Sequence, residues 1–355
     1  MAEDSSRSHP PPFAASKESP GQVLAAAGEM LLTERSGGCG KADVPHRFSQ
    51  FCSDSCAACS GSCSFPAAAD SAFVLSGVSP SLLPSLCRTK LEQCCNASFF
   101  LILTKENTPL GSYIVNECDG KKLLVNSELL DMLPKRLSLS YSRTRRCAVV
   151  GSGGILLNSR CGQEIDQADL IIRLNLPPMN FSEDVGTKTS LVTINPSIIE
   201  LRYKGLQARR KPFVDSLRPY KDALFLIPSF TFEKLNAYGY LTLYTMEDFG
   251  LFQQTFFLNP KYLASLGNYW KQEGLEVSRL STGFMFASIA LEFCEHLTLY
   301  GFWPFPYDLS NQPLSHHYYD NKRPHLSVHD MPREFSHFLR LYAQGVLRLQ
   351  LGKCQ

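Results

Sequence analysis

Four of the eight histidines of the chain lie within fourteen positions of its C-terminal part, at His316, His317, His325 and His329. An imidazole titrates near neutral pH, so it can take a proton from a hydroxyl or donate one to a departing phosphate oxygen. A metal site is disfavoured, because the sequence contains no His-Glu-x-x-His and no Asp-x-Asp pair. The cluster therefore indicates either acid–base chemistry beside a phosphate or histidines exposed on a loop.

A glycine-rich turn, Gly-Ser-Gly-Gly at 151–154, follows the apolar stretch 147–150. Glycines after a strand can admit a phosphate near a helix N-terminus, as in dinucleotide-binding folds. The dinucleotide fingerprint fails at its third glycine, where Leu156 stands, and no Gly-Lys-Ser/Thr of a phosphate-binding loop follows. An NAD-type oxidoreductase is therefore an alternative that the sequence opposes, and a tight turn without a ligand remains open.

Apolar stretches alternate with helical stretches from about residue 147 onward. The predicted strands are 147–150, 170–175, 191–195, 223–230 and 297–302, and the predicted helices are 196–206, 259–273, 283–295 and 332–347. This alternation predicts an α/β fold, with a Rossmann-like, mainly parallel sheet flanked by helices. Ligands bind beyond the carboxyl ends of such strands, so we expect the site in the loops after Val150, Leu174, Ile194 and Tyr300.

The N-terminal part of the chain has a different composition. Residues 1–90 are rich in Ser, Pro, Ala and Gly, without strand or helix periodicity, and are predicted to be disordered or stem-like. We therefore place a catalytic domain at 91–355. The net charge of +2 provides no electrostatic footprint for nucleic acid or an acidic membrane, and no signal peptide or apolar run of about twenty residues is found.

The thirteen cysteines favour an oxidising compartment, because such a count is unusual in a reducing cytosol. Nine of them precede residue 120, and a zinc site among them is disfavoured because only Cys56 and Cys59 form a Cys-x-x-Cys pair. Glycosylation sequons begin at Asn96 and Asn180, and they weakly favour a secretory lumen.

Four segments resemble, in family order, the sialylmotifs of animal sialyltransferases. "RRCAVVGSGGILLNSRCGQEIDQADLIIRLNLPP" with "DVGTKTSLVTINPSII" resembles the large motif and "RLSTGFMFASIALEFCEHLTLYGFWPF" the small one. "HYYD" resembles the third motif, and His329 with Glu334 the His-x4-Glu of the very small motif. The resemblance covers about residues 140–354, and "NPSII", "RLSTG", "YGFWPF" and "SHHYYDN" look like the α-2,8 branch. "LVTINPSII" and "NPKYL" are most similar to its type VI class.

This resemblance implies a GT-A-variant sialyltransferase fold and an inverting transfer of sialic acid from CMP-sialic acid. The acceptor would be the 8-hydroxyl of a terminal sialic acid on a glycoprotein or glycolipid glycan. It implies no cofactor and no metal, with His329 as the general base and His317 as the partner of the leaving phosphate. The positions that match donor-binding residues are Ser152, Asn175, Asn195, Ser281, Thr282, Gly283, Gly301 and Trp303. For Trp303, core packing is an equally good explanation.

The resemblance also implies the disulfides Cys147–Cys294 and Cys161–Cys354 and residence in the Golgi lumen. Family members are anchored there as single-pass type II membrane proteins, and we expect that anchor not to be present in this chain. The partners implied are CMP-sialic acid and sialylated acceptors, not nucleic acid, and a homodimer is left open.

One position departs from the family pattern. Ser152 stands where relatives carry an asparagine, so a short hydroxyl replaces an amide that would contact the donor or the reacting groups. This departure leaves a second functional class open, namely a catalytically weakened or silent protein that binds sialoglycans.

Overall fold

The computed structural model describes residues 82–136, 144–220, 222–322 and 329–354. The chain divides into two compact units, Met1–Cys39 and Gly40–Gln355, and every described residue belongs to the second unit. The predicted disordered segment, 1–90, thus lies largely outside the described residues. Helix α3, Leu83–Cys94, runs across the predicted boundary at residue 90, and the boundary itself stays a prediction. The helix is fixed there by burial of Leu91 and by contacts with a helix of the core.

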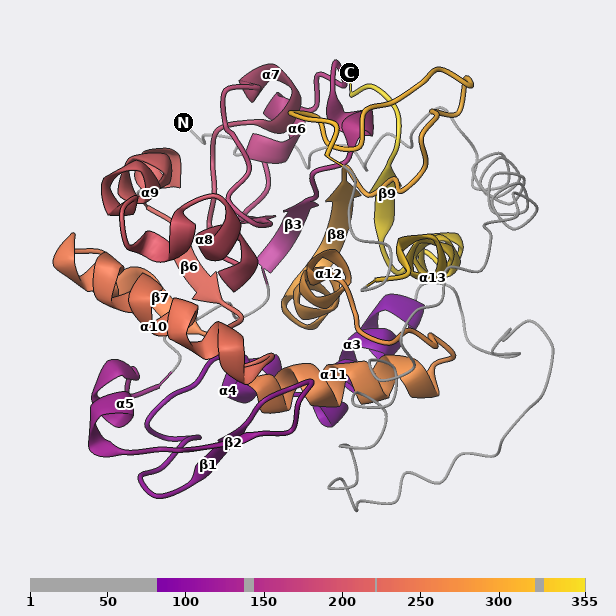
Figure 1. The fold of residues 1–355 in the computed structure, drawn as a ribbon. Helices are drawn as coiled ribbons and strands as arrows, with labels where there is room; N and C mark the ends of the chain where they lie inside the picture. The colour runs from indigo at the N-terminus through magenta and orange to yellow at the C-terminus, as the bar shows by residue number, and fades with distance from the viewer. Residues whose placement is uncertain (1–81, 137–143, 221, 323–328, 355) are drawn as a thin grey trace, which may run out of the picture. The chain divides into compact units, whose positions relative to one another are not determined.

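A seven-stranded sheet, in which every neighbouring pair is parallel, forms the core of the described part of the chain (Figure 1). Its order is β7-β6-β5-β4-β3-β8-β9. The strands are β3 (Thr144–Val150), β4 (Leu170–Arg173), β5 (Leu191–Thr193), β6 (Leu224–Ile227), β7 (Thr255–Phe257), β8 (Cys294–Tyr300) and β9 (Arg348–Gln350). All residues of β4 and β5 are buried, as expected for strands of a parallel sheet covered on both faces.

Helices surround this sheet, and a small antiparallel hairpin of β1 (Tyr113–Val115) and β2 (Lys122–Leu124) precedes it. Besides α3, the α-helices are α4 (Ala97–Phe100), α5 (Ser127–Met132), α6 (Gly162–Asp166), α7 (Ser182–Val185), α8 (Pro196–Leu201), α9 (Arg210–Leu217), α10 (Glu233–Asp248), α11 (Pro260–Gln272), α12 (Thr282–Phe293) and α13 (Met331–Ala343). Short 3₁₀ turns are η2 (Gly154–Leu156), η3 (Lys204–Leu206), η4 (Arg218–Tyr220) and η5 (Phe252–Gln254). None of the helices in the described ranges is both long and apolar enough to cross a bilayer.

The predicted α/β class with a mainly parallel sheet is confirmed, and the five predicted strands correspond to β3, β4, β5, β6 and β8. The four predicted helices correspond to α8, α11, α12 and α13. The first of these ends at Leu201 instead of residue 206, and the predicted remainder is not α-helical, because residues 204–206 all adopt a positive φ. Strands β7 and β9 were not predicted.

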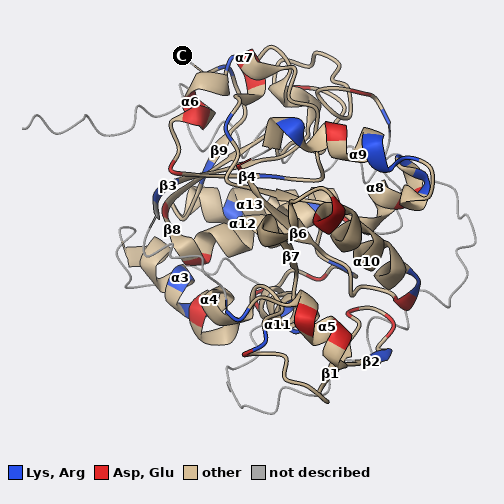
Figure 2. Cartoon of the chain, turned by 90° about the vertical axis from the view of Figure 1, so that its left-hand side faces the viewer, with Lys and Arg blue, Asp and Glu red and all other residues tan. Residues whose placement is uncertain are grey.

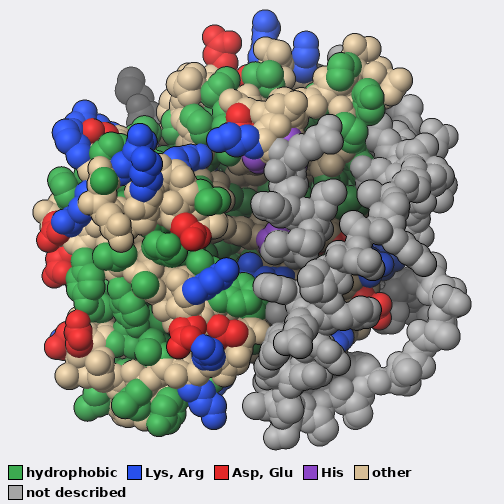
Figure 3. All heavy atoms as spheres, in the orientation of Figure 1, with side chains coloured by type: hydrophobic (Ala, Val, Ile, Leu, Met, Phe, Trp, Pro, Cys, Tyr) green, Lys and Arg blue, Asp and Glu red, His purple; other side chains and the backbone are tan. Residues whose placement is uncertain are grey.

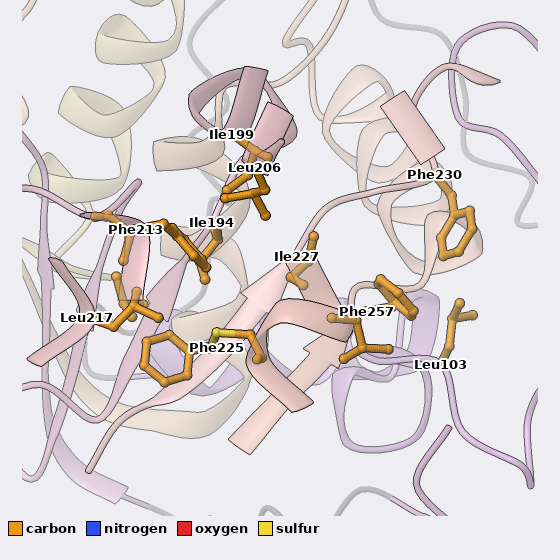
Figure 4. Close-up of a cluster of buried hydrophobic side chains, with 14 of the residues drawn as sticks. Leu103, Ile194, Ile199, Leu206, Phe213, Leu217, Phe225, Ile227, Phe230 and Phe257 are labelled. Carbon is orange, nitrogen blue, oxygen red and sulfur yellow. The ribbon is translucent and has the colours of Figure 1, made fainter. Parts of the chain in front are cut away.

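Buried aromatic and aliphatic side chains fill the space between the sheet and the helices that follow β5 and β6. Figure 4 shows Phe213 and Leu217 of α9 close to Phe225 of β6, while Phe257 of β7 lies near Leu103. At the surface, α9 and α10 are joined by an ion pair of Arg210 with Asp248, and Figure 2 shows such charges spread over the helices. The residues of this core cluster come from segments far apart in the sequence, and their packing holds β5, β6 and β7 against the helices.

The register of the central strands brings their carboxyl ends to one edge of the sheet. Val150, the last residue of β3, pairs with Arg173 at the end of β4 and with Tyr300 at the end of β8. Helix α12 packs on β3 and β8 and leads directly into β8 (Figure 1). A Cβ at Gly283 would lie 3.0 Å from the Phe302 ring, so the N-terminus of α12 lies beside the loop after β8.

The structure forms both disulfides that the resemblance implies. Cys147 of β3 is bonded to Cys294 of β8, and Cys161 before α6 is bonded to Cys354. The bonds close separations of 147 and 193 residues. A cross-link over loops of this length restricts the unfolded chain strongly, by about 5 kcal/mol each in the chain-entropy model.

We predict that the double substitution Cys161→Ser/Cys354→Ser lowers the free energy of unfolding by about 2–5 kcal/mol, because the unfolded chain regains loop entropy. Urea unfolding measures this loss, with Cys94→Ser, an exposed cysteine outside both disulfides, as the control. Non-reducing peptide mapping of the parent should find both pairs. Free thiols at these four positions in folded protein would contradict the assignment.

Candidate active site

The glycine turn at 151–154 packs directly against two other backbone segments. Gly151 donates its N–H to the Tyr300 carbonyl at 2.8 Å, and Gly153 donates to the Gly301 carbonyl at 3.0 Å. A Cβ at Gly153 would lie 2.5 Å from the Gly301 oxygen, and one at Gly154 would lie 1.9 Å from the Ser315 oxygen. Close approach of backbones thus accounts for these glycines, without a dinucleotide.

The segment that carries His317 is held on this turn by main-chain contacts. Gly153 and His317 form an isolated antiparallel bridge, and Tyr318 donates its N–H to the Ser152 carbonyl at 2.9 Å. The His317 ring lies flat on the Tyr319 ring, with centroids 5.0 Å apart. The backbone therefore places this histidine at the carboxyl end of β3, where the sequence predicted the site.

His317 is paired with a carboxylate on its own turn. Its Nδ1 lies 2.7 Å from Oδ1 of Asp320, and Asp320 also accepts the N–H of Lys322 at 3.1 Å. Burial acts to raise the pKa of Asp320, but these hydrogen bonds and the nearby positive charges lower it below its ordinary value. An ionised Asp320 accepts the Nδ1–H of His317 and thereby orients the ring, with Nε2 left for another partner.

The hydroxyl of Tyr319 connects Ser152 to Arg202. Burial raises the pKa of Tyr319, while hydrogen bonds of its hydroxyl with Ser152 and Arg202 act in the opposite direction. Arg202 also donates to the Leu176 carbonyl at 3.2 Å. The Ser152 hydroxyl thus faces the third-motif segment rather than lying apart from it.

His329 immediately precedes the N-cap of α13 and is held by a backbone carbonyl. Its Nδ1 lies 3.2 Å from the Arg279 oxygen, which can only accept, so Nδ1 carries the proton and Nε2 keeps its lone pair. Burial is the largest cause that lowers the pKa of His329; the Arg279 charge adds to it, and the Arg279 carbonyl and Glu117 oppose it. His329 is therefore neutral near pH 7, as a base must be.

The N-terminus of α12 is fixed by the predicted residues Ser281 and Glu334. Ser281 caps the helix by accepting the N–H of Phe284 at 3.1 Å. It donates its own N–H to Oε1 of Glu334 at 2.6 Å and its hydroxyl to Oε2. Burial raises the pKa of Glu334 to about 7, against the effect of these two hydrogen bonds. Glu334 thus joins the start of α13, and with it His329, to the start of α12.

The two predicted asparagines lie in the loops after β4 and β5 and contact each other. Asn195 donates its backbone N–H to Oδ1 of Asn175 at 3.3 Å and its Nδ2 to the hydroxyl of Thr282 at 3.1 Å. Asn175 adopts a φ of 72°, a conformation that asparagine tolerates better than most residues. Oδ1 of Asn195 is buried and has no hydrogen-bond partner in the described part of the chain, so it can accept from a ligand.

Two predicted donor-binding residues make contacts with neighbouring parts of the fold. Gly301 adopts a φ of 72° and supplies the carbonyl that accepts from Gly153. Trp303 is 5% exposed, packs on Phe335, and donates its indole N–H to the Tyr307 carbonyl at 2.7 Å. These contacts fit the core-packing alternative for Trp303, and donor binding by Trp303 stays a prediction.

The structure brings the remaining predicted residues to one edge of the sheet and leaves the two sequons elsewhere. Figure 3 shows histidine side chains reaching the surface near the middle of the viewed face, beside residues drawn in grey. Asn96 caps α4, and Asn180 is exposed after β4, with neither linked to the site by a contact in the described ranges. Glycosylation at either position stays a prediction.

Three residues around the two histidines were not predicted from the sequence. Asp320 is part of "HYYD" but was assigned no role from the sequence. Its spacing of three residues from His317 suits a local carboxylate–imidazole pair. Glu117 and Arg279 are 162 residues apart and form an ion pair with a distance of 2.9 Å. No local pattern signals a contact of that separation.

Comparison with known proteins agrees with this geometry. Residues 102–346 match the model of glycosyltransferase family 29 (sialyltransferase). The chain is 42% identical to human α-2,8-sialyltransferase 8F over 271 residues, which cover 76% of this chain and 68% of that protein. Human α-2,8-sialyltransferase 8E is 42% identical, covering 75% of this chain and 72% of that protein. The α-N-acetylneuraminide α-2,8-sialyltransferase of Xenopus tropicalis is 44% identical, covering 76% and 78%.

The crystal structure of a mammalian sialyltransferase is 21% identical to the chain with a TM-score of 0.44, and it covers 76% of this chain and 79% of its own. The relatives of three α-2,8 types have nearly equal identities, so the branch is confirmed without type VI being singled out. With more than two thirds of its length matched by the family model, the chain belongs to glycosyltransferase family 29, the sialyltransferases.

Proposed function

We propose that this sialyltransferase transfers sialic acid from CMP-sialic acid, with inversion, to the 8-hydroxyl of a sialic acid that ends an acceptor glycan. The names of the relatives at 42–44% identity support the α-2,8 linkage. The contrast between the two histidines carries the mechanism: His329 is neutral against a carbonyl, whereas His317 is paired with the carboxylate of Asp320. We assign the base to the ring whose Nδ1 faces a carbonyl and the phosphate partner to the ring whose Nδ1 faces a carboxylate.

His329 accepts the proton of the acceptor hydroxyl on Nε2 as the oxygen attacks the anomeric carbon of the donor. His317 stabilises the phosphate of the departing CMP through its own Nε2 and donates a proton to it. Asp320 holds the His317 ring for this task. Since both rings have their Nδ1 occupied, each presents only Nε2 to a substrate.

The donor binds across the carboxyl edge of the sheet in this proposal. Asn175 and the unpartnered Oδ1 of Asn195 contact the nucleotide, and the N–H groups at the start of α12 hold an anionic group of the donor. Ser152 contributes its hydroxyl beside Tyr319. Thr282 is already oriented by the Asn195 amide, so binding requires little rearrangement there.

We further propose that the protein works in the lumen of the Golgi, an oxidising compartment in which two disulfides persist. In that compartment the sequons at Asn96 and Asn180 meet the glycosylation machinery. A homodimer stays a proposal without a specific interface.

A transfer assay with purified protein and radiolabelled CMP-sialic acid tests the linkage. We expect product with acceptors that end in sialic acid and none with the same acceptors after sialidase treatment. Resistance of the new linkage to an α-2,3-specific sialidase, with digestion by a broad-specificity sialidase, would support it. Equal transfer to acceptors that end in galactose would contradict the α-2,8 assignment.

His329→Ala should reduce kcat by about 10²- to 10⁴-fold while CMP still binds, because general-base assistance is lost and the nucleotide contacts remain. His317→Ala should weaken both donor affinity and kcat, since it removes a phosphate partner. Melting temperature, CMP affinity and transfer rate are measured on the same samples. A folded His329→Ala protein with parental turnover would remove this histidine from the mechanism.

The parent enzyme should lose kcat/KM toward acid pH as His329 becomes protonated. Because burial lowers the pKa of His329, the midpoint of this loss should lie below about 6.5, the ordinary value for histidine. A pH profile of kcat/KM at constant ionic strength measures it. A midpoint well above the ordinary value would exclude the neutral, carbonyl-bound histidine as the base.

Ser152→Asn should raise the transfer rate if Ser152 weakens the site, because an amide supplies a donor and an acceptor at a longer reach. Ser152→Ala serves as the matched control that removes the hydroxyl. If the parent binds sialylated glycans but neither hydrolyses nor transfers the donor, and Ser152→Asn restores transfer, the protein is a binding homologue instead.

A further inference from the structure

Arg279, whose carbonyl contacts His329, forms an ion pair with Glu117 through its side chain. We propose that the pair of Arg279 and Glu117 positions His329: it fixes the Arg279 peptide, whose carbonyl fixes the imidazole with Nε2 toward the acceptor. Arg279 and Glu117 are thus positioning residues rather than catalytic residues. The inference rests on the general-base task of His329 in the proposed function.

The ion pair has the two-bond geometry of an arginine fork. Nε of Arg279 donates to Oε1 of Glu117 at 3.2 Å, and Nη2 donates to Oε2 at 2.9 Å. Nη2 also lies 3.3 Å from the Thr231 hydroxyl. The side chains are only 19% and 12% exposed, so solvent screens this pair less than a surface pair. Three contacts therefore restrain the Arg279 side chain.

Glu117 is itself anchored to the core, so it can serve as a fixed point. It follows β1, and its backbone N–H donates to the Phe230 carbonyl at 2.9 Å. The next residue, Cys118, donates to the Thr231 carbonyl at 2.9 Å. These bonds attach the hairpin to the loop after β6, and that loop also supplies the hydroxyl that Arg279 contacts. The ion pair thus joins Arg279 to the rigid part of the fold.

The backbone carbonyl of Arg279 determines the orientation of the base, His329. This carbonyl accepts from Nδ1 of His329 at 3.2 Å, and Leu280 and Ser281 follow Arg279 into the N-terminus of α12. His329 is restrained on its C-terminal side by Asp330, which caps α13 by accepting the Arg333 N–H at 3.0 Å. The Arg279 carbonyl is the contact that sets the ring, so a rotated peptide would turn Nε2 away from the acceptor.

The charges of Arg279 and Glu117 also act on the pKa of His329, in opposite directions. Burial lowers the pKa of His329; the Arg279 charge lowers it further, and the Glu117 charge raises it. These are the charged side chains that act on the ring in the described ranges. Removing one partner leaves the other uncompensated, so the two single substitutions should shift the pKa in opposite directions. A neutral contact that only stabilised the fold would not produce opposite shifts, and the loss of kcat distinguishes positioning from a charge effect alone.

The test compares Arg279→Gln, Glu117→Gln and Arg279→Lys in the full chain. Both glutamine variants should lose about tenfold in kcat, a part of the general-base contribution, with the KM for CMP-sialic acid within about twofold of the parent. The acid limb of kcat/KM should move to higher pH in Arg279→Gln and to lower pH in Glu117→Gln. Arg279→Lys keeps the charge, so its limb should match the parent while kcat is only partly recovered.

Arg348→Gln is the matched control, because it breaks another part-buried ion pair, with Glu164, between β9 and α6. It should lower the melting temperature without a change in kcat or the pH profile. If the single variants fail to fold, the double variant Glu117→Gln/Arg279→Gln removes both charges and should lose kcat while its acid limb stays near that of the parent.

Variants with a lowered melting temperature but parental kcat and pH profile would overturn the inference. Its failure is distinct from a failure of the proposed function, which His329→Ala tests. A His329→Ala enzyme with parental turnover overturns the base itself, whereas an inactive His329→Ala beside unaffected Glu117→Gln and Arg279→Gln overturns only the positioning pair.

Discussion

Backbone contact between the glycine turn at 151–154 and residues 301 and 315–318 is the constraint on which the site depends. The turn ends the central strand β3, and its N–H and carbonyl groups bond to the loop after β8 and to the third-motif segment. No side chain fits at Gly154, where an added Cβ would meet the Ser315 oxygen at 1.9 Å. The position of His317 is therefore set by main-chain geometry, which is stiffer than a side-chain contact.

The N-terminus of α12 is where the donor-binding and base-holding parts of the site meet. Ser281 caps this helix and is held by Glu334 from α13, while Arg279 two residues earlier holds His329. A movement of α12 would thus disturb together the N–H groups that we propose to hold the donor and the histidine that we propose as the base. The small and very small motifs are far apart in sequence, but these hydrogen bonds join them in one site.

The disulfides stabilise the same region from outside the site. Cys147 lies in β3 before the glycine turn and Cys161 lies after it, and their partners come from β8 and the C-terminal end. Both bonds join segments whose separation in sequence makes pairing entropically costly. By restricting the unfolded chain, the two bonds offset this cost.

The sequence alone determined the fold class, and it predicted the edge of the sheet and the histidines that form the candidate site. These follow from apolar periodicity and from motifs, both of which are local in the chain. Helix α3 across residue 90, the strands β7 and β9, and the packing contacts of Trp303 became visible only in the tertiary structure. The same holds for the partners Asp320, Glu117 and Arg279, because a hydrogen bond or ion pair depends on distances in space. Glu117 and Arg279, 162 residues apart, become neighbours only once the hairpin packs beside the loop after β6.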